Sequence, residues 1–246
     1  MRETGKDQPQ HPLKSISYTR VLSLSWEVHP GIPTWPGDPP VEFRTGSELE
    51  AQGYFSRQFS MGEHGGTHIN APNSFHTRGA SIDQYPAESL VAPAAVVDVT
   101  EQVKANPDYA MTLDDLSRWE GEHGFVPAGS VVLLHTGWQS RWSRVEEYLG
   151  TGADGGLHFP GFSADAVRRL LNERNAGGLG IDTPGVEPGI DLAFTVNRLT
   201  LEKRRIVLEN LCDLDQLPAT GVTLVIGLLR LRGGTGSPAS LLAFVP

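Results

Sequence analysis

Three of the chain's eight histidines lie within a stretch of thirteen residues, from His64 to His76. His64 and His68 are separated only by Gly-Gly-Thr, and Pro72 follows shortly after them. Each glycine disfavours a helix by about 1 kcal/mol and an internal proline by about 3 kcal/mol. The segment is therefore predicted to be extended or looped rather than helical.

In an extended chain, side chains at every second position share one face. The face that begins with His64 also carries Gly66, His68, Asn70, Pro72, Ser74 and His76. The glycine leaves space beside the imidazoles for an ion and a substrate. Two imidazoles that converge on one point, with an oxygen donor nearby, suit an ion such as Zn²⁺ or Mn²⁺. We therefore favour a metal site over loop histidines that only bond a turn.

The elements that must position this segment alternate between strands and helices. Short β-branched runs predict strands at 18–26, 94–99, 130–135, 178–181, 206–208 and 222–229. Thr112 and Ser163 each precede a helical pattern as good N-caps, the second helix running over 164–175. This alternation predicts an α/β layered domain. Residues 1–18 are predicted to be a flexible N-terminal arm and residues 19–246 the single domain.

Composition excludes several classes of protein. The 246 residues carry a net charge of −9, so clustered cations for nucleic acid or anionic lipid are not expected. No stretch approaches the roughly 20 apolar residues of a membrane span, and the N-terminal residues lack the apolar core of a secretory signal. A cytoplasmic protein is predicted. Cys212 is the only cysteine, which excludes an intramolecular disulfide, and its apolar surroundings indicate a buried structural residue.

The histidine segment resembles the signature of a known family, His-x-Gly-Thr-His-x-Asp-x-Pro-x-His. Residues 64–74 read His-Gly-Gly-Thr-His-Ile-Asn-Ala-Pro-Asn-Ser. Further family blocks follow the same order along the chain, at 35–38, 82–86, 94–99, 131–138, 180–183, 208–211 and 233–238. On these motifs the chain is identified as a member of the cyclase, or metal-dependent hydrolase, family that includes bacterial kynurenine formamidase and isatin hydrolase. The resemblance covers residues from about position 18 onward.

The resemblance implies a swivelling β/β/α fold, assembled as a homodimer or homotetramer. It also implies a divalent metal that activates water to open an amide or lactam of a small molecule. The family's ligands are the two signature histidines, the signature aspartate, a later histidine and a glutamate beyond it, and its last signature histidine transfers protons. Carried over to this chain, His64, His68 and Glu209 match their family counterparts.

Three family positions differ: Asn70 replaces the aspartate, Ser74 the last signature histidine and Asn197 the later histidine. Glu209 is then the one anionic ligand, and a single carboxylate neutralises two ions poorly. We therefore predict one divalent ion, Zn or Mn, held by His64, His68 and Glu209. Asn70 is predicted to be a weak fourth ligand or a partner of a ligand. Three protein ligands and a water form the open arrangement that lowers the pKa of bound water to about 7.

Proton transfer needs a different residue in this chain. Ser74 has no pKa near neutrality, so it is predicted to position the substrate rather than act as a base. His76 is predicted to take over proton transfer, provided that the strand stays regular past the proline. Glu209 is the alternative base if it is free of metal.

Candidates for substrate contacts are Trp35, Phe75 and Trp138 as an aromatic wall and Asn197 as a polar contact, with core packing as the alternative for the aromatic residues. His135 and His158 are weaker candidates for the pocket. With these residues in the pocket, the family resemblance implies a hydrolase that opens an amide, lactam or related bond of a small molecule. The rival hypothesis is a non-hydrolytic cyclase or dehydratase, or a small-molecule binding protein, in which the metal site is reduced or lost.

Overall fold

A computed structural model describes residues 15–153 and 155–246 of the chain. Its strands are β1 (Arg20–Ser23), β2 (Glu42–Ser47), β3 (Ser56–Ser60), β4 (His68–Asn70), β5 (Val91–Asp98), β6 (Ala110–Met111), β7 (Val131–His135), β8 (Gly161–Phe162), β9 (Gly178–Ile181), β10 (Ile206–Glu209), β11 (Val222–Leu228) and β12 (Gly236–Val245). Its α-helices are α1 (Leu49–Gln52), α2 (Thr100–Ala105), α3 (Leu113–His123), α4 (Val145–Leu149), α5 (Ala164–Asn172) and α6 (Thr195–Thr200). Most of the predicted N-terminal arm, residues 1–14, lies outside the described residues.

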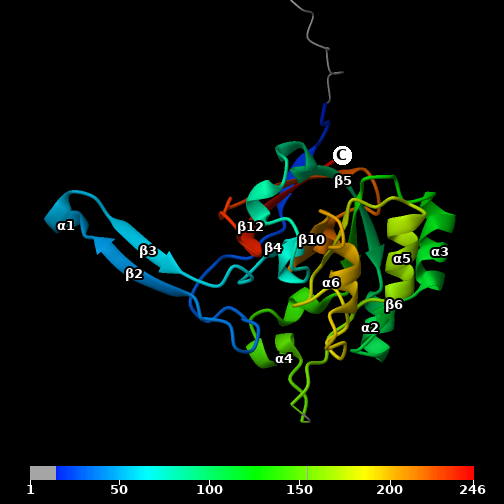
Figure 1. Ribbon diagram of the computed structural model, residues 1–246, viewed down its shortest axis with the longest axis horizontal. Coiled ribbons are helices and arrows are strands. Elements are labelled where there is room, and N and C mark those ends of the chain that lie inside the picture. The colour runs from blue at the N-terminus through cyan, green and yellow to red at the C-terminus, as the bar shows by residue number, and fades with distance from the viewer. Residues whose placement is uncertain (1–14, 154) are drawn as a thin grey trace, which may run out of the picture.

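Eight strands form one mixed sheet in the order β1-β12-β11-β5-β7-β9-β10-β4. The central strands β5, β7, β9 and β10 are parallel, and the remaining pairs are antiparallel. The first residues of β12 also pair with β4, while its last residues pair with β1. This extra pairing curls the sheet into a barrel-like layer and brings β4, β10 and the start of β12 together (Figure 1).

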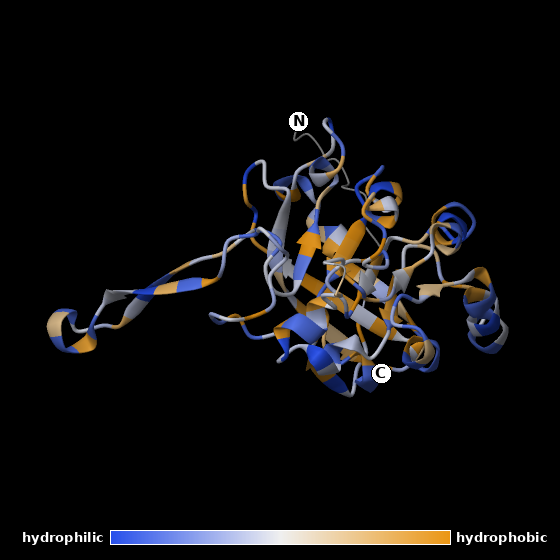
Figure 2. Ribbon diagram, turned by 90° about the horizontal axis from the view of Figure 1, so that it is seen from below, coloured by the Kyte–Doolittle hydropathy of each residue, from blue (hydrophilic) through white to orange (hydrophobic). Residues whose placement is uncertain are grey.

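The two faces of the sheet are both apolar, as expected for parallel strands covered on each side. Along β5, Ala95 and Val97 belong to the cluster that includes helix residues such as Leu116 of α3 and Leu170 of α5. Ala94 and Val96 belong to a second cluster, which joins residues of β11 and β12 across the curled sheet. Figure 2 shows hydrophobic strands in the centre of the body and hydrophilic outer surfaces on the helices around them.

The predicted α/β class is confirmed, and most predicted elements have the right type. β9 has the predicted bounds, and its neighbour β10 runs one residue further than predicted, to Glu209. β9 contains Gly178 because a Cβ there would lie 2.2 Å from the carbonyl oxygen of Ile206 in β10. α3 and α5 begin directly after Thr112 and Ser163, whose side chains accept the expected backbone hydrogen bonds. α5 ends three residues earlier than predicted.

One feature that the sequence analysis does not predict is a hairpin, formed by β2, α1 and β3, that projects from the body (Figure 1). Its polar-rich strands carry no amphipathic pattern. It presents four largely exposed apolar side chains: Leu49, Tyr54, Phe55 and Phe59. None of the helices in the two described segments combines the length and the apolar character needed to span a bilayer.

Candidate functional site

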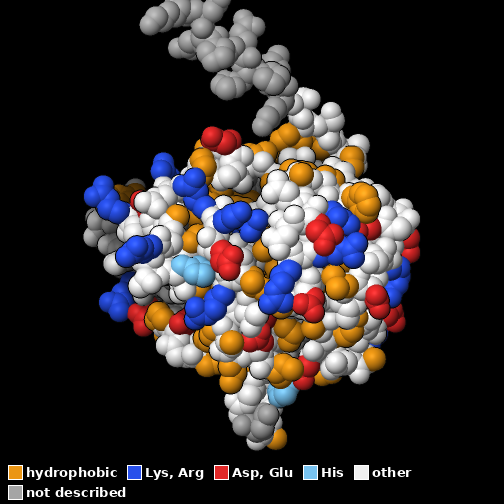
Figure 3. All heavy atoms as spheres, turned by 45° about the vertical axis from the view of Figure 1, so that its right-hand side comes forward, with side chains coloured by type: hydrophobic (Ala, Val, Ile, Leu, Met, Phe, Trp, Pro, Cys, Tyr) orange, Lys and Arg blue, Asp and Glu red, His pale blue; other side chains and the backbone are white. Residues whose placement is uncertain are grey.

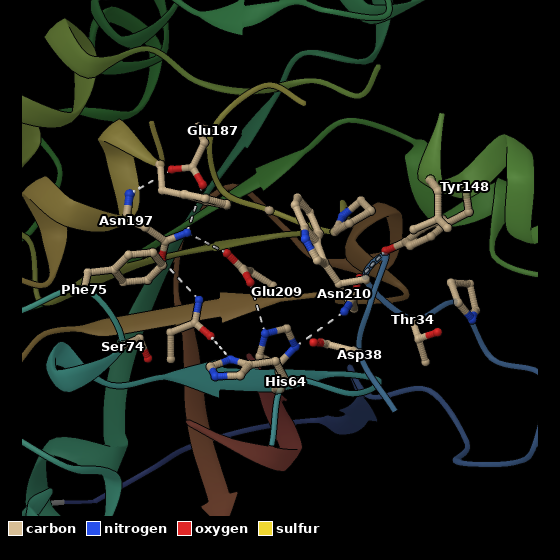
Figure 4. Close-up of a pocket in the computed structure, with 18 residues that line it drawn as sticks. Thr34, Asp38, His64, Ser74, Phe75, Tyr148, Glu187, Asn197, Glu209 and Asn210 are labelled. Atoms are coloured by element: carbon tan, nitrogen blue, oxygen red, sulfur yellow. Dashed lines mark hydrogen bonds and ion pairs between the residues drawn. The ribbon is translucent and has the colours of Figure 1, made fainter. Parts of the chain in front are cut away.

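A cavity of about 260 Å³ opens beside β4, the end of β10 and the start of α6 (Figure 4). Its polar side is formed by His64, His68, Asn70, Glu187, Asn197 and Glu209. Its apolar side is formed chiefly by Trp35, Phe75 and Phe194, and the ring of Phe194 contacts the other two with centroids about 6 Å apart. A reactive polar end and an aromatic wall are thus combined in one pocket.

His68 and Glu209 form a buried pair at the polar end of this pocket. They are directly opposite residues of the antiparallel strands β4 and β10, and His68 Nε2 lies 3.0 Å from Glu209 Oε2. His68 Nδ1 lies 2.9 Å from the carbonyl oxygen of Gly66, and because a carbonyl only accepts, Nδ1 is the donor. A neutral His68 would then turn the lone pair of Nε2 toward a carboxylate oxygen. A proton or another cation must therefore lie between the two side chains.

The charge state of Glu209 agrees with this requirement. Burial by itself would raise the pKa of Glu209, but the hydrogen bond and charge of His68, together with a hydrogen bond from Asn197, hold it below its usual value. The Glu209 carboxylate also accepts from the Val186 N–H. Glu209 is thus ionised at neutral pH, and its negative charge is stabilised by His68 and by hydrogen bonds from Asn197 and the Val186 N–H.

His64 stands beside this pair on the loop before β4, with its ring perpendicular to that of His68 and the centroids 5.3 Å apart. The turn that joins them includes Gly66 at a positive φ of 64°. His64 Nδ1 lies 2.8 Å from Asn70 Oδ1, and His64 Nε2 lies 3.0 Å from the hydroxyl of Thr235. Burial, and then the charge of His68, lower the pKa of His64, so its imidazole is neutral at neutral pH.

The glycine that makes room for His64 is distant in sequence. A Cβ on Gly236, at the start of β12, would lie 2.7 Å from Cε1 of His64. The glycines of the signature make room for other side chains, since a Cβ on Gly65 would contact Met61 and a Cβ on Gly66 would contact Ile32. The prediction that the signature glycine creates the space for an ion is therefore wrong in its detail.

Asn70 and Asn197 lie side by side in the pocket, with Asn70 Nδ2 3.1 Å from Asn197 Oδ1. Asn197 in turn donates through Nδ2 to Glu209 and to Glu187, at 3.0 Å in both cases. The three positions that differ from the family signature therefore lie in or beside one pocket, since Ser74 also lines it and donates to the carbonyl oxygen of Thr235.

Glu187 is a pocket residue that the sequence analysis misses. It lies in a turn without any recognisable motif, and only its proximity in the fold reveals it. It is 3% exposed, and burial, followed by the charge of Glu209, raises its pKa to about 7. The exposed Asp38 also lines the cavity. The sequence-based charge count assumed that Glu209 is the one anionic group of the site, but Glu187 and Asp38 are further carboxyl groups there.

Two predicted site residues lie elsewhere. A 3₁₀ turn at Pro72–Ser74 ends the strand alternation, so His76 faces a neighbouring surface groove, where its Nε2 bonds the carbonyl oxygen of Arg198. Its predicted role in proton transfer is therefore not supported. Trp138 is 1% exposed, and its indole N–H donates to the carbonyl oxygen of Tyr148 within the core, so the core-packing alternative is the correct one.

Other predictions on single residues are resolved by the fold. Trp35 and Phe75 line the cavity as pocket-wall residues. His135 and His158 do not line it, and each pairs with an aspartate, Asp98 or Asp108. Cys212 is buried, and burial raises the pKa of its thiol to about 12, which makes it unreactive at neutral pH.

The donor set fits one divalent cation better than two. His68 Nε2 and Glu209 Oε2 are two acceptors that already require a cation between them, and a divalent ion can replace the proton there. Within residues 15–153 and 155–246, no group of three or more His, Cys, Asp or Glu side chains converges on a common ion position. His64 contributes the remaining imidazole, but both of its ring nitrogens are hydrogen-bonded in this conformation.

The raised pKa of Glu187 predicts a specific dependence of stability on pH. The folded protein favours the protonated carboxyl of Glu187 more than the unfolded chain does. Its contribution to the free energy of unfolding is therefore fully present below pH 4.5 and is lost as the pH rises through about 7. The shift corresponds to a loss of about 3 kcal/mol in the free energy of unfolding. Glu187→Gln remains neutral and should flatten this decline, as measured by urea unfolding at pH 5 and pH 8. Equal declines in both proteins would contradict the assignment.

Comparisons with known proteins place the chain among similar sequences and folds. A family model described as "Putative cyclase" matches residues 22–188. The isatin hydrolase of Roseibium aggregatum is 34% identical over 218 residues, which cover 85% of this chain and 82% of that protein. A kynurenine formamidase of Bacillus cereus is 26% identical, with 88% of this chain and 93% of that protein covered.

Solved structures are similar over the same extent. Isatin hydrolase A from Ralstonia solanacearum superposes with a TM-score of 0.87 at 35% identity, covering 92% of each chain. A structure described as a potential metal-dependent hydrolase with cyclase activity superposes with a TM-score of 0.70 at 25% identity, covering 92% of this chain and 98% of that one. The barrel-like α/β fold of this chain is thus shared with these proteins.

Proposed function

The chain belongs to the cyclase family, and from this premise we propose that it hydrolyses an amide or lactam bond of a small aromatic molecule bound in the pocket. The observation that carries the proposal is the buried pair of His68 and Glu209, with His64 beside it, at the end of an aromatic-walled cavity. The similar proteins named isatin hydrolase and kynurenine formamidase supply the reaction class.

The size and lining of the pocket support a planar substrate of one or two rings. Its volume of about 260 Å³ lies slightly below the roughly 300–1,000 Å³ typical of ligand pockets, which favours a small ligand. Trp35, Phe75 and Phe194 provide ring faces and edges against which an aromatic substrate can stack. The polar groups lie on the opposite side, where the amide or lactam would be held.

We assign one divalent cation, zinc or manganese, to His68 and Glu209. His64 would become the third ligand when its Nε2 leaves the hydroxyl of Thr235, which it contacts in this conformation. Bound there, the cation would polarise the carbonyl and lower the pKa of a water molecule, which is the chemistry that hydrolysis requires. The backbone carbonyl of Gly66 holds Nδ1 of His68 and Asn70 holds Nδ1 of His64, so Nε2 of each ring is the nitrogen that would bind a cation. Asn70 therefore serves as a partner of a ligand rather than as a ligand.

Proton transfer in this site falls to carboxylates, because Ser74 lacks a suitable pKa and His76 lies outside the cavity. Glu187 lines the cavity, and its pKa of about 7 allows it to take up and return a proton near neutral pH. Its two oxygens are held by the backbone N–H and the side-chain amide of Asn197. We assign to Glu187 the proton-transfer role that the family's last signature histidine has.

The proposal is tested by incubating the purified chain with isatin and with an N-formyl arylamine, in the presence of Zn²⁺ or Mn²⁺, and following ring opening or deformylation by absorbance. We expect hydrolysis of at least one of them and its loss in His64→Ala. Asn73→Ala, which alters an asparagine outside the cavity, is the matched control and should keep the rate. Absence of hydrolysis from a folded, metal-loaded chain across a wider panel of lactams and formamides would refute the proposal.

A second candidate is a non-hydrolytic cyclase or dehydratase that works without metal. It is favoured by one observation: all four ring nitrogens of His64 and His68 are engaged in contacts within the protein. This candidate predicts full activity in chelator-treated protein, whereas the hydrolase predicts none. Measuring activity before and after chelator treatment therefore distinguishes the metal-free enzyme from the hydrolase.

We also propose that the chain forms a homo-oligomer through the projecting hairpin. An isolated two-stranded hairpin is only marginally stable in water, and this one exposes Leu49, Tyr54, Phe55 and Phe59 by more than half of each side chain. Phe55→Glu combined with Leu49→Glu should convert a dimer or tetramer into monomers, as measured by light scattering after size exclusion. Phe125→Glu, which alters an exposed phenylalanine of the body, should leave the oligomer intact. An unchanged mass in the hairpin variant would contradict this assignment.

The remaining partner proposals follow from charge. With a net charge of −9, the chain is not expected to bind nucleic acid or an anionic membrane surface, and we expect it to act in the cytoplasm. On the face shown in Figure 3, Lys and Arg side chains are interspersed with Asp and Glu side chains. A small-molecule substrate is the partner that this surface and the cavity favour.

A further inference from the structure

A continuous line of hydrogen bonds runs across the pocket from Glu209 through Asn197 and Asn70 to His64 (Figure 4). The successive distances are 3.0 Å from Asn197 Nδ2 to Glu209 Oε1, 3.1 Å from Asn70 Nδ2 to Asn197 Oδ1, and 2.8 Å from His64 Nδ1 to Asn70 Oδ1. These residues come from β10, α6, β4 and the loop before β4. All four are buried or largely shielded from solvent, so water does not compete for the bonds.

The direction of this line is fixed at the carboxylate end. An ionised carboxylate only accepts hydrogen bonds, so Asn197 must turn its NH₂ group toward Glu209. Glu187 fixes the same orientation, because its two oxygens accept from the backbone N–H and the side-chain NH₂ of Asn197 at 2.9 and 3.0 Å. The oxygen of Asn197 is thereby left facing Asn70.

The orientation then passes to the next residue. Asn70 must offer its NH₂ group to the oxygen of Asn197, which leaves its own oxygen facing His64. An amide oxygen only accepts, so Nδ1 of His64 must carry the proton of the neutral ring. His68 also carries a proton on Nδ1, held by the carbonyl oxygen of Gly66, in addition to the proton between its Nε2 and Glu209.

From this network we propose that Asn197 and Asn70 are positioning residues that hold His64 in the Nδ1–H tautomer and so leave the lone pair on Nε2. This inference rests on the proposed function in one respect: the free lone pair of His64 Nε2 serves to bind the cation of the hydrolase. Nε2 lies 3.0 Å from the hydroxyl oxygen of Thr235, which donates its single proton to Glu63 at 2.7 Å. That oxygen competes with Asn70 for the ring proton, and the shorter contact of 2.8 Å from His64 Nδ1 to Asn70 Oδ1 favours the proton on Nδ1. The hydroxyl can release Nε2 without losing its own hydrogen bond to Glu63.

The same network explains why both substitutions are amides. A carboxylate at position 70 alone would face the oxygen of Asn197, so two acceptors would meet. Asn197 could avoid this only by turning its oxygen toward Glu209 and Glu187, which creates the same conflict there. Asn70 and Asn197 are therefore expected to depend on each other.

The test is the ¹⁵N NMR spectrum of histidine side chains in the metal-free protein at pH 8, assigned with His64→Gln. We expect His64 to show a single Nδ1–H tautomer in the wild type. In Asn197→Leu the Asn70 amide is free to turn over, so the Nε2–H tautomer should become populated. Asn73→Ala should change nothing, and the His68 signal should stay the same throughout, because the Gly66 carbonyl fixes it independently.

Once the His64 signal is assigned, the wild-type spectrum alone tests whether His64 is in the Nδ1–H tautomer. An Nε2–H tautomer or a doubly protonated ring at His64 would overturn the proposal. If Asn197→Leu does not fold, Asn70→Leu removes the acceptor itself and is read in the same way, and an unchanged Nδ1–H tautomer in either folded variant overturns the role of the asparagines. A chain that shows the expected tautomers but hydrolyses nothing would refute the proposed function alone.

Discussion

Glu209→Gln is expected to reduce amide or lactam hydrolysis by at least about 100-fold while leaving the fold intact, since even partners of metal ligands cost about 10–100-fold when removed. The glutamine NH₂ group can donate to the lone pair of His68 Nε2, which lies 3.0 Å from the replaced oxygen. The one remaining side-chain oxygen, in the place of Glu209 Oε1, can still accept from Asn197 and from the Val186 N–H. With this hydrogen bond in place, no cation is needed between residue 209 and His68.

The measurement is the steady-state rate together with metal content and thermal unfolding. The variant should bind no stoichiometric metal, and added Zn²⁺ should no longer raise its unfolding temperature. Glu120→Gln is the matched control, because Glu120 is also buried but pairs with Arg174 away from the cavity. That control should lose stability and keep its metal and its rate. A Glu209→Gln enzyme of normal rate would show that hydrolysis does not depend on this pair.

The second large effect is expected from restoring the three family residues together, as Asn70→Asp, Ser74→His and Asn197→His. Asn70 and Asn197 contact each other, Asn197 contacts Glu209, and Ser74 lines the same cavity, so the new ligands would surround one space. A carboxylate at position 70, next to His64, adds negative charge to that of Glu209 and so favours binding of a second ion. Metal occupancy, measured by elemental analysis, should rise from about one ion per chain to about two.

The triple variant should also become dependent on metal for its stability. Without metal, two carboxylates in a buried space repel each other, so removal of the ions should lower its unfolding temperature much more than that of the wild type. Asn70→Asp alone should be destabilised, because it breaks the bond to Asn197 without supplying the other ligands. An occupancy that stays at one ion would mean that these three positions do not face a common metal site.

Much of the fold could be predicted because its central strands have a strong apolar pattern. Runs such as those of β7 and β9 are buried on both faces, and Thr112 and Ser163 mark the starts of their helices through local bonds. The hairpin was not predicted, because its strands are exposed on both faces and show no alternation. β12 was not predicted either, since it contains Pro238, which lies where the strand passes from its pairing with β4 to its pairing with β1.

Site residues could be predicted from sequence where they lie close together in one segment or in a block that matches the family. His64, His68, Asn70 and Ser74 come from one segment, and Glu209 from a recognisable block, and all of them line the cavity. His76 does not line the cavity, because a turn after the strand changes the direction of its side chain. Residues joined only by the fold could not be found from sequence.

Glu187 and Gly236 are the examples of that last class. Glu187 lies in a turn, and its contact with Asn197 exists only because α6 packs beside the end of β10. Gly236 lies in β12, and its lack of a side chain matters only because β12 pairs with β4 next to His64. Neither residue carries a pattern that distinguishes it from other turn or strand residues.

The most direct test of the account is a titration of chelator-treated protein with Zn²⁺ or Mn²⁺ while the opening of a small aromatic lactam or formamide is followed. If the cation acts at His68 and Glu209, there should be no hydrolysis without metal and a rate that saturates at one ion per chain. Binding should also release a proton, because the ion replaces the one held between His68 and Glu209. A metal-free protein that works at full rate, or a loaded protein that opens no lactam or formamide, would contradict this account.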